Sequence, residues 1–452
     1  MWSKGRLPKA GTSAGARALG RPLVAAERAL YISSRDSPLN LVVLVRLDGP
    51  AVHDVLPTAL AGLRQRHPLL RARIVGPLAR PRFEVSDADT AGSGPIPLRV
   101  VRASESEGAY ELAEEEMNAP FDPAASPLAR VTCVSGPGHS TDLILTVHHA
   151  IADGASAANL VHELLESCRQ GLAGEPAATP VPASMPPPLT DLLPVGMRGL
   201  AGWRKMLTLA ARESRDEIAY RLGSRGCRRP VPALGRAVLR PLSLDVAETA
   251  ALVSQGRRQR LTLTSLVAAG LLWQVNAVLY EGRPCTMRAV IWVDLRPYLD
   301  PQAGAETLGC YVSMLRFPVR VDRRRGLAAL ATDVQRQIER ASRRGDRFPA
   351  AQLSAPMARL AARWPVIRLG NVALSHAAAP AIQSGYGPVS VREVRAFVSN
   401  DRIGAELAAV SGVIHGRLWC DLLYLDSDYG EDAAAALGDG LFAALREFSD
   451  AA

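Results

Sequence analysis

The sequence lacks the features that mark several large classes of protein. Its six cysteines are scattered without a close pair, so neither a disulfide framework nor a cysteine-based metal site is indicated. This usage favours the reducing cytoplasm as the compartment. The basic residues at the amino terminus are not followed by an apolar segment with a cleavage site, and we therefore do not expect export.

Long apolar runs are also scarce. The longest uncharged window, 261–280, is interrupted by threonine, serine, glutamine and asparagine. A transmembrane helix needs about 20 predominantly apolar residues. We therefore interpret this window as a buried helix and expect no transmembrane segment.

The composition is that of a globular protein, with 452 residues of which 48% are hydrophobic and 21% charged. This length suggests two domains or one bilobal unit. Both halves mix predicted strands with amphipathic helices, which favours two α+β lobes. The stretch at 175–195 contains too many prolines for a helix, and we therefore interpret it as an extended crossover between the lobes. The predicted organisation is a flexible basic lead-in at 1–20, a first lobe at 21–174, the crossover at 175–195 and a second lobe at 196–452.

The net charge is +9 and the pI is near 9.6, which favours an anionic partner through long-range attraction. We expect no nucleic-acid partner, because zinc-finger spacing, an aromatic RNA-binding motif and a basic arm are missing. An acidic carrier protein or a nucleotide-bearing thioester fits the charge, and a general arginine bias fits it equally. A basic amphipathic helix predicted at 196–222 leaves peripheral membrane contact open, although docking onto the fold is favoured.

One stretch concentrates the chemistry. An apolar strand at 143–147 leads into His148-His149-Ala150-Ile151-Ala152-Asp153-Gly154, and a helix is predicted from Ser156. Successive side chains of a strand point to opposite faces. His148 and His149 therefore face different surroundings, and we expect one to be structural and the other free for chemistry.

Several chemistries can be set aside for this turn. A His-Glu-x-x-His zinc motif, a Gly-x-Ser-x-Gly elbow and a phosphate-binding Gly-x-x-x-x-Gly-Lys loop are all missing, and we expect no metal. A lone histidine remains as a general base that takes a proton from a hydroxyl or amine attacking an acyl group. Asp153 is expected to be a structural anion that needs an arginine or backbone donors. Gly154 is expected to allow a tight backbone turn.

The turn and three further segments resemble the condensation-domain superfamily, which includes chloramphenicol acetyltransferase and the polyketide-associated and wax ester synthase-type O-acyltransferases. The turn resembles the active-site signature His-His-x-x-x-Asp-Gly. The other similar segments are Arg66-His67-Pro68-Leu69-Leu70-Arg71, then Phe121-Asp122 with Pro127-Leu128-Ala129-Arg130, and finally Asp294-Leu295-Arg296-Pro297 with Gly309-Cys310-Tyr311.

The resemblance implies two chloramphenicol-acetyltransferase-like lobes with an active-site tunnel between them, where a thioester donor and an acceptor meet at His149. His149 would be the general base and His148 its buried partner. Asp153 would form an ion pair with Arg71. Asp294 and Arg296 would support the site from the second lobe.

The sequence also departs from the family pattern. The Asp-Phe-Gly-Trp signature that the plant acyltransferases of the superfamily carry late in the chain is missing. Where related acyltransferases often have Ser-Asn-x-Gly, this chain has Asn371-Val372-Ala373-Leu374-Ser375-His376. The sequence therefore does not identify which residue donates hydrogen bonds to the oxyanion. The candidates for oxyanion or substrate contacts are Ser313, Asn371 and Ser375, with His376 as a second titrating group.

These observations predict a cytoplasmic, monomeric acyltransferase of lipid, polyketide or other secondary metabolism. The donor would be a thioester on an acyl carrier protein or on coenzyme A, with no bound cofactor. The acceptor would be a small-molecule or lipid alcohol. An amide-forming condensation enzyme of the nonribosomal-peptide type is the first alternative. A member of the same fold that recruits partners without acyl transfer is the second.

Overall fold

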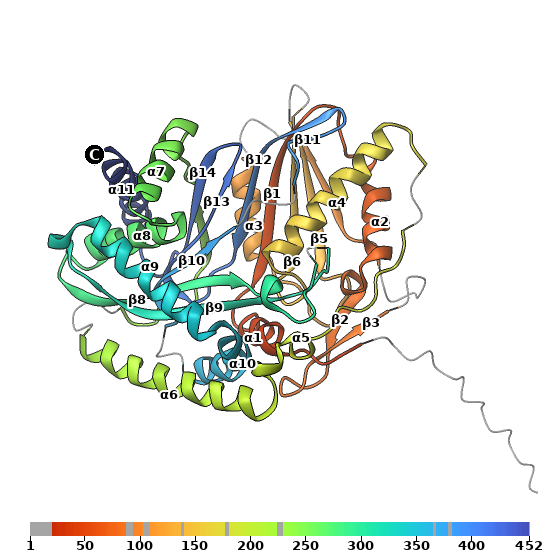
Figure 1. The fold of residues 1–452 in the computed structure, drawn as a ribbon. Coiled ribbons are helices and arrows are strands. Elements are labelled where there is room, and N and C mark those ends of the chain that lie inside the picture. The colour runs from red at the N-terminus through yellow and green to blue at the C-terminus, as the bar shows by residue number, and fades with distance from the viewer. Residues whose placement is uncertain are drawn as a thin grey trace, which may run out of the picture.

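Two six-stranded mixed sheets organise the fold, which we describe from a computed structural model (Figure 1). The described residues are 20–86, 94–102, 108–136, 140–176, 180–223, 229–304, 306–364, 368–377 and 382–451. The predicted lead-in at 1–20 lies outside them except for its last residue.

The first sheet has the strand order β11-β12-β1-β6-β5-β4. Its strands are β1 (Asn40–Asp48), β4 (Leu98–Arg102), β5 (Ala129–Ser135), β6 (Ser140–His148), β11 (Gly385–Tyr386) and β12 (Val389–Val398). The apolar faces of α2 (Leu56–Arg66) and α4 (Gly154–Leu172) cover one side of it, and α3 (Ala109–Asn118) packs on the other. A small hairpin of β2 (Ala72–Val75) and β3 (Arg82–Val85) lies beside this sheet.

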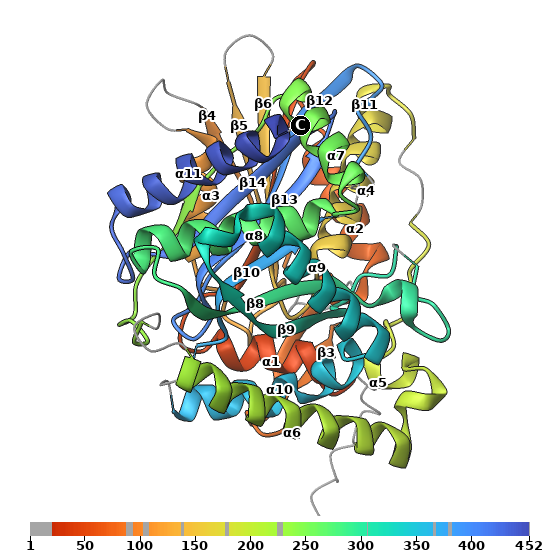
Figure 2. The same cartoon turned by 60° about the vertical axis from the view of Figure 1, so that its left-hand side comes forward.

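The second sheet has the order β7-β14-β13-β10-β8-β9. Its strands are β7 (Ala237–Arg240), β8 (Cys285–Asp294), β9 (Val312–Val321), β10 (Gly370–His376), β13 (Ala405–Ile414) and β14 (Arg417–Leu425). One face is covered by α7 (Val246–Arg258), α8 (Leu263–Leu279), α9 (Leu327–Arg344) and α11 (Glu431–Asp450), as Figure 2 shows. Because α8 is apolar on nearly all sides, it is buried at the centre of this layer, which confirms the interpretation of 261–280.

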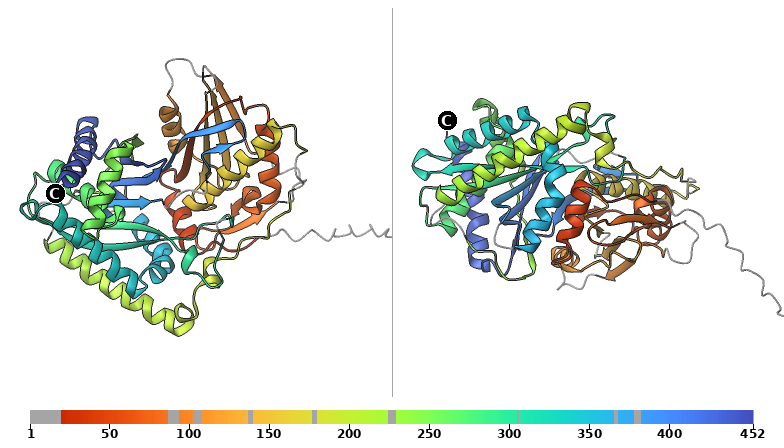
Figure 3. Two further views of the ribbon diagram at one scale, coloured as in Figure 1. Left: turned by 45° about the horizontal axis from the view of Figure 1, so that its top comes forward. Right: turned by 90° about the horizontal axis from the view of Figure 1, so that it is seen from below.

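The opposite face of the second sheet has two kinds of neighbour. Over β8 and β9 it meets α6 (Gly199–Gly223) and α10 (Arg347–Arg363). Further along, Trp419 and Leu423 pack against Val42 and Phe397 of the first sheet. The two lobes therefore share an apolar contact as well as a chain connection. Figure 3 shows the ribbons of both lobes in two further views.

The division into sheets differs from the predicted boundary at 195/196. Strands β11 and β12 follow that boundary in the chain, yet β12 pairs antiparallel with β1 and completes the first sheet. Alternating apolar residues identify β12 as a strand, but they do not specify its partner, because any half-buried sheet edge satisfies the same pattern.

Several short elements complete the chain. Helices α1 (Ala25–Ser33) and α10 pack on each other, and neither was predicted from the sequence. The crossover contains one turn of helix, α5 (Leu189–Leu192), and is otherwise extended where it is described. The remaining turns are the 3₁₀ helices η1 (Pro68–Arg71), η2 (Val195–Met197), η3 (Arg296–Tyr298) and η4 (Arg323–Arg325).

The structure bears on two expectations, one about disulfides and one about membrane-spanning helices. Cys133, Cys168, Cys310 and Cys420 are free and buried, whereas Cys285 is disulfide-bonded, so the expectation of a chain without disulfides is wrong at Cys285. Within the described ranges no single helix is long and apolar enough to cross a bilayer. Only α7 and α8 taken together meet that criterion, and they are bent by 103°.

Candidate active site

The His-His-x-x-x-Asp-Gly turn joins the centre of the first sheet to helix α4. Strand β6 lies between β1 and β5 and ends at His148, which is paired with Asn40. The Ile151 amide donates to the His148 carbonyl and closes the turn. Asp153 then caps α4, because its Oδ1 accepts a hydrogen bond of 3.0 Å from the Ser156 amide.

His149 is held in one tautomer. Its Nδ1 lies 2.8 Å from the carbonyl oxygen of Ala152, and because a carbonyl only accepts, Nδ1 must carry the proton. In the neutral ring Nε2 therefore has the free lone pair, and it has no hydrogen-bond partner in the described part of the chain. Burial lowers the pKa of His149 below its ordinary value, against the raising effect of the Ala152 carbonyl. The ring is therefore a neutral base at pH 7.

His148 has different surroundings. Its Nδ1 accepts from the Ala150 amide at 3.1 Å, so Nε2 carries the proton toward the Ser34 hydroxyl at 3.1 Å. Ser34 in turn donates to the Tyr31 carbonyl. Burial, with a smaller effect of His149, lowers the pKa of His148 to about 4. Both ring nitrogens of His148 are thus occupied, as expected for the structural member of the pair.

Asp153 forms a buried ion pair across the two lobes. Its Oδ2 accepts from Arg296 Nη1 at 2.7 Å and from the Tyr311 amide at 2.7 Å, and its own amide donates to the Gly309 carbonyl. The two side chains are only 6% and 5% exposed. Burial lowers the pKa of Arg296, but the carboxylates of Asp153 and Asp294 outweigh it and hold the pKa above its ordinary value.

The predicted Asp153–Arg71 pair is therefore wrong: the cation on Asp153 is Arg296. The reason is topological, because the start of α4 faces the loop of the second lobe that carries η3, whereas Arg71 ends η1 in the first lobe. The early segment supports α4 further along, through Glu163. The Oε2 of Glu163 lies 2.9 Å from His67 Nε2 and 3.3 Å from Arg66 Nε.

Two more residues complete the junction of the lobes. Asp294 Oδ1 accepts from the Arg296 amide at 3.0 Å and from Nη1 at 3.2 Å, which orients the guanidinium. Ser156 was not predicted as part of the site. Its Oγ accepts from Arg296 Nη2 at 2.8 Å and from the Gly309 amide at 3.0 Å. Its position three residues after a helix-capping aspartate is the only signal that the sequence offers for it.

Gly154 differs from its expected role. Its φ is not positive, and a Cβ atom built on it would meet nothing within 4 Å. The turn therefore does not need glycine for its backbone geometry. Gly154 instead leaves open space at the first residue of α4, next to the turn that carries His149.

Two of the three oxyanion candidates, Ser313 and Asn371, use their side chains in hydrogen bonds within the protein. The Ser313 hydroxyl donates to the Arg347 carbonyl. Asn371 is fully buried; its Oδ1 accepts from the Arg288 amide and Tyr220, and its Nδ2 donates to Glu406 and Tyr280. Ser375 lies on β10 beside Trp292 and Val410. The side chains of Ser313 and Asn371 are therefore structural in this state.

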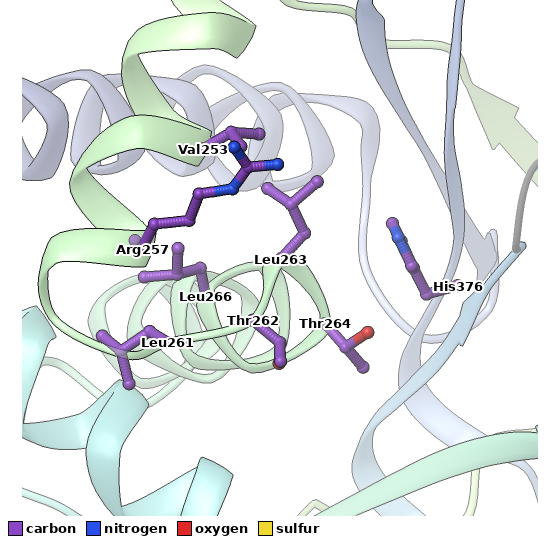
Figure 4. A pocket seen from close by; sticks show the side chains of 9 residues that line it. Val253, Arg257, Leu261, Thr262, Leu263, Thr264, Leu266 and His376 are labelled. Carbon is purple, nitrogen blue, oxygen red and sulfur yellow. The ribbon is translucent and has the colours of Figure 1, made fainter.

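His376 faces a separate pocket of about 380 Å³ (Figure 4). Its Nδ1 lies 2.8 Å from Ser411 Oγ, and burial lowers its pKa. Across the pocket lie Arg257 and Thr262 at the junction of α7 and α8. His149 is not among the residues that line this pocket. In the described ranges no group of three or more His, Cys, Asp or Glu side chains is placed to hold a metal ion.

Two family models match this chain, one in each lobe. Residues 30–183 match the family described as "Condensation domain", and residues 234–381 match "Phthiocerol/phthiodiolone dimycocerosyl transferase C-terminus". The first match contains the His149 turn and the second contains Arg296. Through these two matches the chain is similar to the condensation-domain superfamily in both lobes, and it has the two-lobed mixed α+β fold of that superfamily.

Within that superfamily the chain is similar to both peptide synthetases and a lipid transferase. It is 25% identical over 345 residues to phosphinothricin tripeptide synthetase PhsC of Streptomyces viridochromogenes, covering 72% of this chain and 30% of PhsC. It is 26% identical over 296 residues to the phthiocerol/phthiodiolone dimycocerosyl transferase of Mycobacterium ulcerans, covering 63% and 65%. The match thus spans less than two thirds of either relative. Among solved structures, TRI3 trichothecene 15-O-acetyltransferase from Fusarium sporotrichioides has the same fold, with a TM-score of 0.79 at 14% identity and coverage of 97% and 96%.

Breaking the Asp153–Arg296 pair should destabilise the protein. We expect Arg296→Met and Asp153→Ala each to lower the free energy of unfolding by about 3–5 kcal/mol, because each leaves a buried charge unpaired. Chemical denaturation measures the change. Arg71→Met serves as the control for the pair that the sequence predicted. A larger loss in Arg71→Met than in Arg296→Met would contradict the assignment.

Substitution of Gly154 should leave stability nearly unchanged. Gly154→Ala adds a methyl group to open space at a helical position, so we expect the melting temperature to stay within a few degrees of wild type, since surface-like changes cost under about 0.5 kcal/mol. Differential scanning calorimetry checks this. A loss comparable to that of Arg296→Met would show that the turn requires glycine after all.

Proposed function

We propose that the protein transfers an acyl group from a thioester to a hydroxyl acceptor, with His149 as general base. One observation carries the proposal: the Ala152 carbonyl fixes the proton of His149 on Nδ1, so the unpartnered Nε2 of a neutral ring is the proton acceptor. A neutral imidazole is the form that general-base catalysis requires.

The proposed reaction needs only groups of the chain and its two substrates. As the acceptor hydroxyl attacks the thioester carbonyl, its proton moves to Nε2 of His149 and a carbon–oxygen bond forms. Collapse of the tetrahedral intermediate breaks the carbon–sulfur bond, and the proton passes from His149 to the leaving thiolate. The products are an ester and a free thiol. His149 forms no covalent bond in either step.

Ester formation is favoured over amide formation by the second lobe. The match of residues 234–381 is to a family named for a mycocerosyl transferase, and the Asp294-Leu295-Arg296-Pro297 segment lies within it. An amide-forming reaction is the second candidate, because the condensation-domain match at 30–183 contains the motif and the chain is also similar to the peptide synthetase PhsC. A carrier-protein or coenzyme A thioester is proposed as donor, in keeping with the net charge of +9.

Removal of the proposed base should abolish most turnover. We expect His149→Ala to lower kcat by about 10²–10⁴-fold with little change in melting temperature. The assay offers acyl-carrier-protein and acyl-coenzyme A donors against a panel of alcohols and amines, and mass spectrometry identifies the product. His53→Ala, at a histidine whose side chain is 39% exposed, is the control.

The outcomes of this assay separate the three candidate functions. An ester that depends on His149 supports the proposal, and an amide alone supports the condensation alternative. Binding of a carrier protein without any turnover supports the partner-recruiting alternative. Undiminished turnover by folded His149→Ala would refute the role of His149.

The pH dependence should follow the lowered pKa of His149. Protonation removes the base, so kcat/KM falls as pH decreases through this pKa, and burial places the pKa below the ordinary value near 6.5. We therefore expect more than half of the plateau activity to remain at pH 6.5, with the midpoint of the acid limb at a lower pH. An acid limb centred above pH 6.5 would contradict the buried, neutral histidine.

A further inference from the structure

Helix α6 carries a stripe of exposed apolar side chains on its outer face. The helix has 25 residues and lies along the edge of the second lobe, on the opposite face of the sheet from α8 and α9 (Figures 1 and 2). Five large apolar side chains of this helix are between 54% and 70% exposed: Leu200, Trp203, Leu207, Ile218 and Leu222. Such large apolar side chains usually face the core, so an exposed row of them indicates a partner surface.

The stripe is continuous along the helix. Leu200, Trp203, Leu207, Ala211, Ser214, Ile218 and Leu222 follow one another at intervals of three or four residues, which places them within a single sector of an α-helix. At 1.5 Å per residue the stripe is about 33 Å long. It is therefore a narrow, straight apolar line with a small-residue segment at its centre.

The charges of α6 are sorted about this line. Its carboxylates turn away from the stripe toward the protein: Glu213 pairs with Arg316 at 2.6 Å, and Glu217 pairs with Arg288 at 2.7 Å. Burial alone raises the pKa of Glu217, but Arg221, Arg288 and Arg316 lower it to about 2, so the inward carboxylate stays ionised.

Four of the five cations of α6 are exposed: Arg204, Lys205, Arg215 and Arg221. Arg221 is paired with Glu217 at 2.7 Å and Arg215 with the half-buried Asp216 at 3.0 Å, whereas the fifth cation, Arg212, turns inward to Asp346 at 2.7 Å. In the described residues no carboxylate of α6 is exposed. The outer face thus combines apolar side chains with positive charge.

We propose that α6 docks the protein on an anionic lipid surface, lying in the plane of the interface. A helix with an apolar face, a tryptophan and flanking arginine and lysine side chains is suited to the boundary between headgroups and acyl chains, and anionic lipids attract each cation near the surface. An extended straight line of about 33 Å fits a plane better than the small, curved face of an acidic carrier protein. This docking does not depend on the acyl-transfer reaction proposed above.

Vesicle flotation of the full chain tests the docking. The probes are vesicles of phosphatidylcholine alone and vesicles with about one third phosphatidylglycerol. We expect the protein to float with the anionic vesicles and to be released by high salt, since salt screens exposed charges. Binding to both vesicle types alike, or to neither, would overturn the proposal.

Paired variants locate the binding on α6. We expect Trp203→Ser with Leu207→Ser, and separately Arg204→Glu with Lys205→Glu, each to weaken binding to anionic vesicles at least about tenfold. The charge control is Arg336→Glu with Arg340→Glu, at exposed positions of α9 on the other side of the sheet. The apolar control is Leu234→Ser, at a side chain that is 61% exposed outside α6.

All of these positions are exposed, so every variant should keep its melting temperature. Unchanged vesicle binding in both α6 variants, or an equal loss in the controls, would place the lipid contact elsewhere and overturn the proposal. Loss of binding to an acyl carrier protein in the α6 variants, with vesicle binding retained, would show that the face serves a protein partner and would also overturn it.

Discussion

The ion pair between Asp153 and Arg296 is the interaction on which the proposed site depends. It joins the first residue before α4 to the second lobe, and the Tyr311 amide, Ser156 and the Gly309 carbonyl form further hydrogen bonds with the two residues. Isolated charges are expensive to bury, so the pair is stable only while both lobes are in place. The junction therefore makes the geometry of the motif a property of the whole two-lobed fold.

This junction also governs the chemistry of His149. The Ala152 carbonyl that fixes the imidazole tautomer belongs to the peptide group whose nitrogen is the Asp153 amide, and that amide donates to Gly309 of the second lobe. A shift of the lobes would move this peptide group and with it the acceptor for Nδ1. The aspartate of the motif thus acts on the proposed base through the backbone, without touching the imidazole in the described contacts.

The sequence was sufficient for those parts of the fold that depend on local pattern. The apolar run at 143–147 predicted the strand β6, and helical pattern predicted α4, α6 and α8. It was not sufficient for pairing in space. The partner of Asp153 was placed on Arg71, and the predicted second lobe at 196–452 included β12, which belongs to the first sheet, because ion pairs and strand neighbours are set by tertiary topology. Ser156 was missed for the same reason: its role appears only when Arg296 and Gly309 arrive from the other lobe.

The arrangement of charge explains how an arginine-rich chain can have a selective surface. The total of 53 lysines and arginines against 44 acidic residues is only a modest excess. Many carboxylates, however, are used inside to neutralise buried arginines, as Glu217 does for Arg288 and Asp421 for Arg395. Such a buried pair removes one charge of each sign from the surface, so the excess of cations is carried by the exposed side chains. On α6 the exposed cations lie on the same outer face as the apolar stripe. Positive charge is therefore available where hydrophobic contact is also possible, and the net charge of the chain is unevenly distributed over its surface.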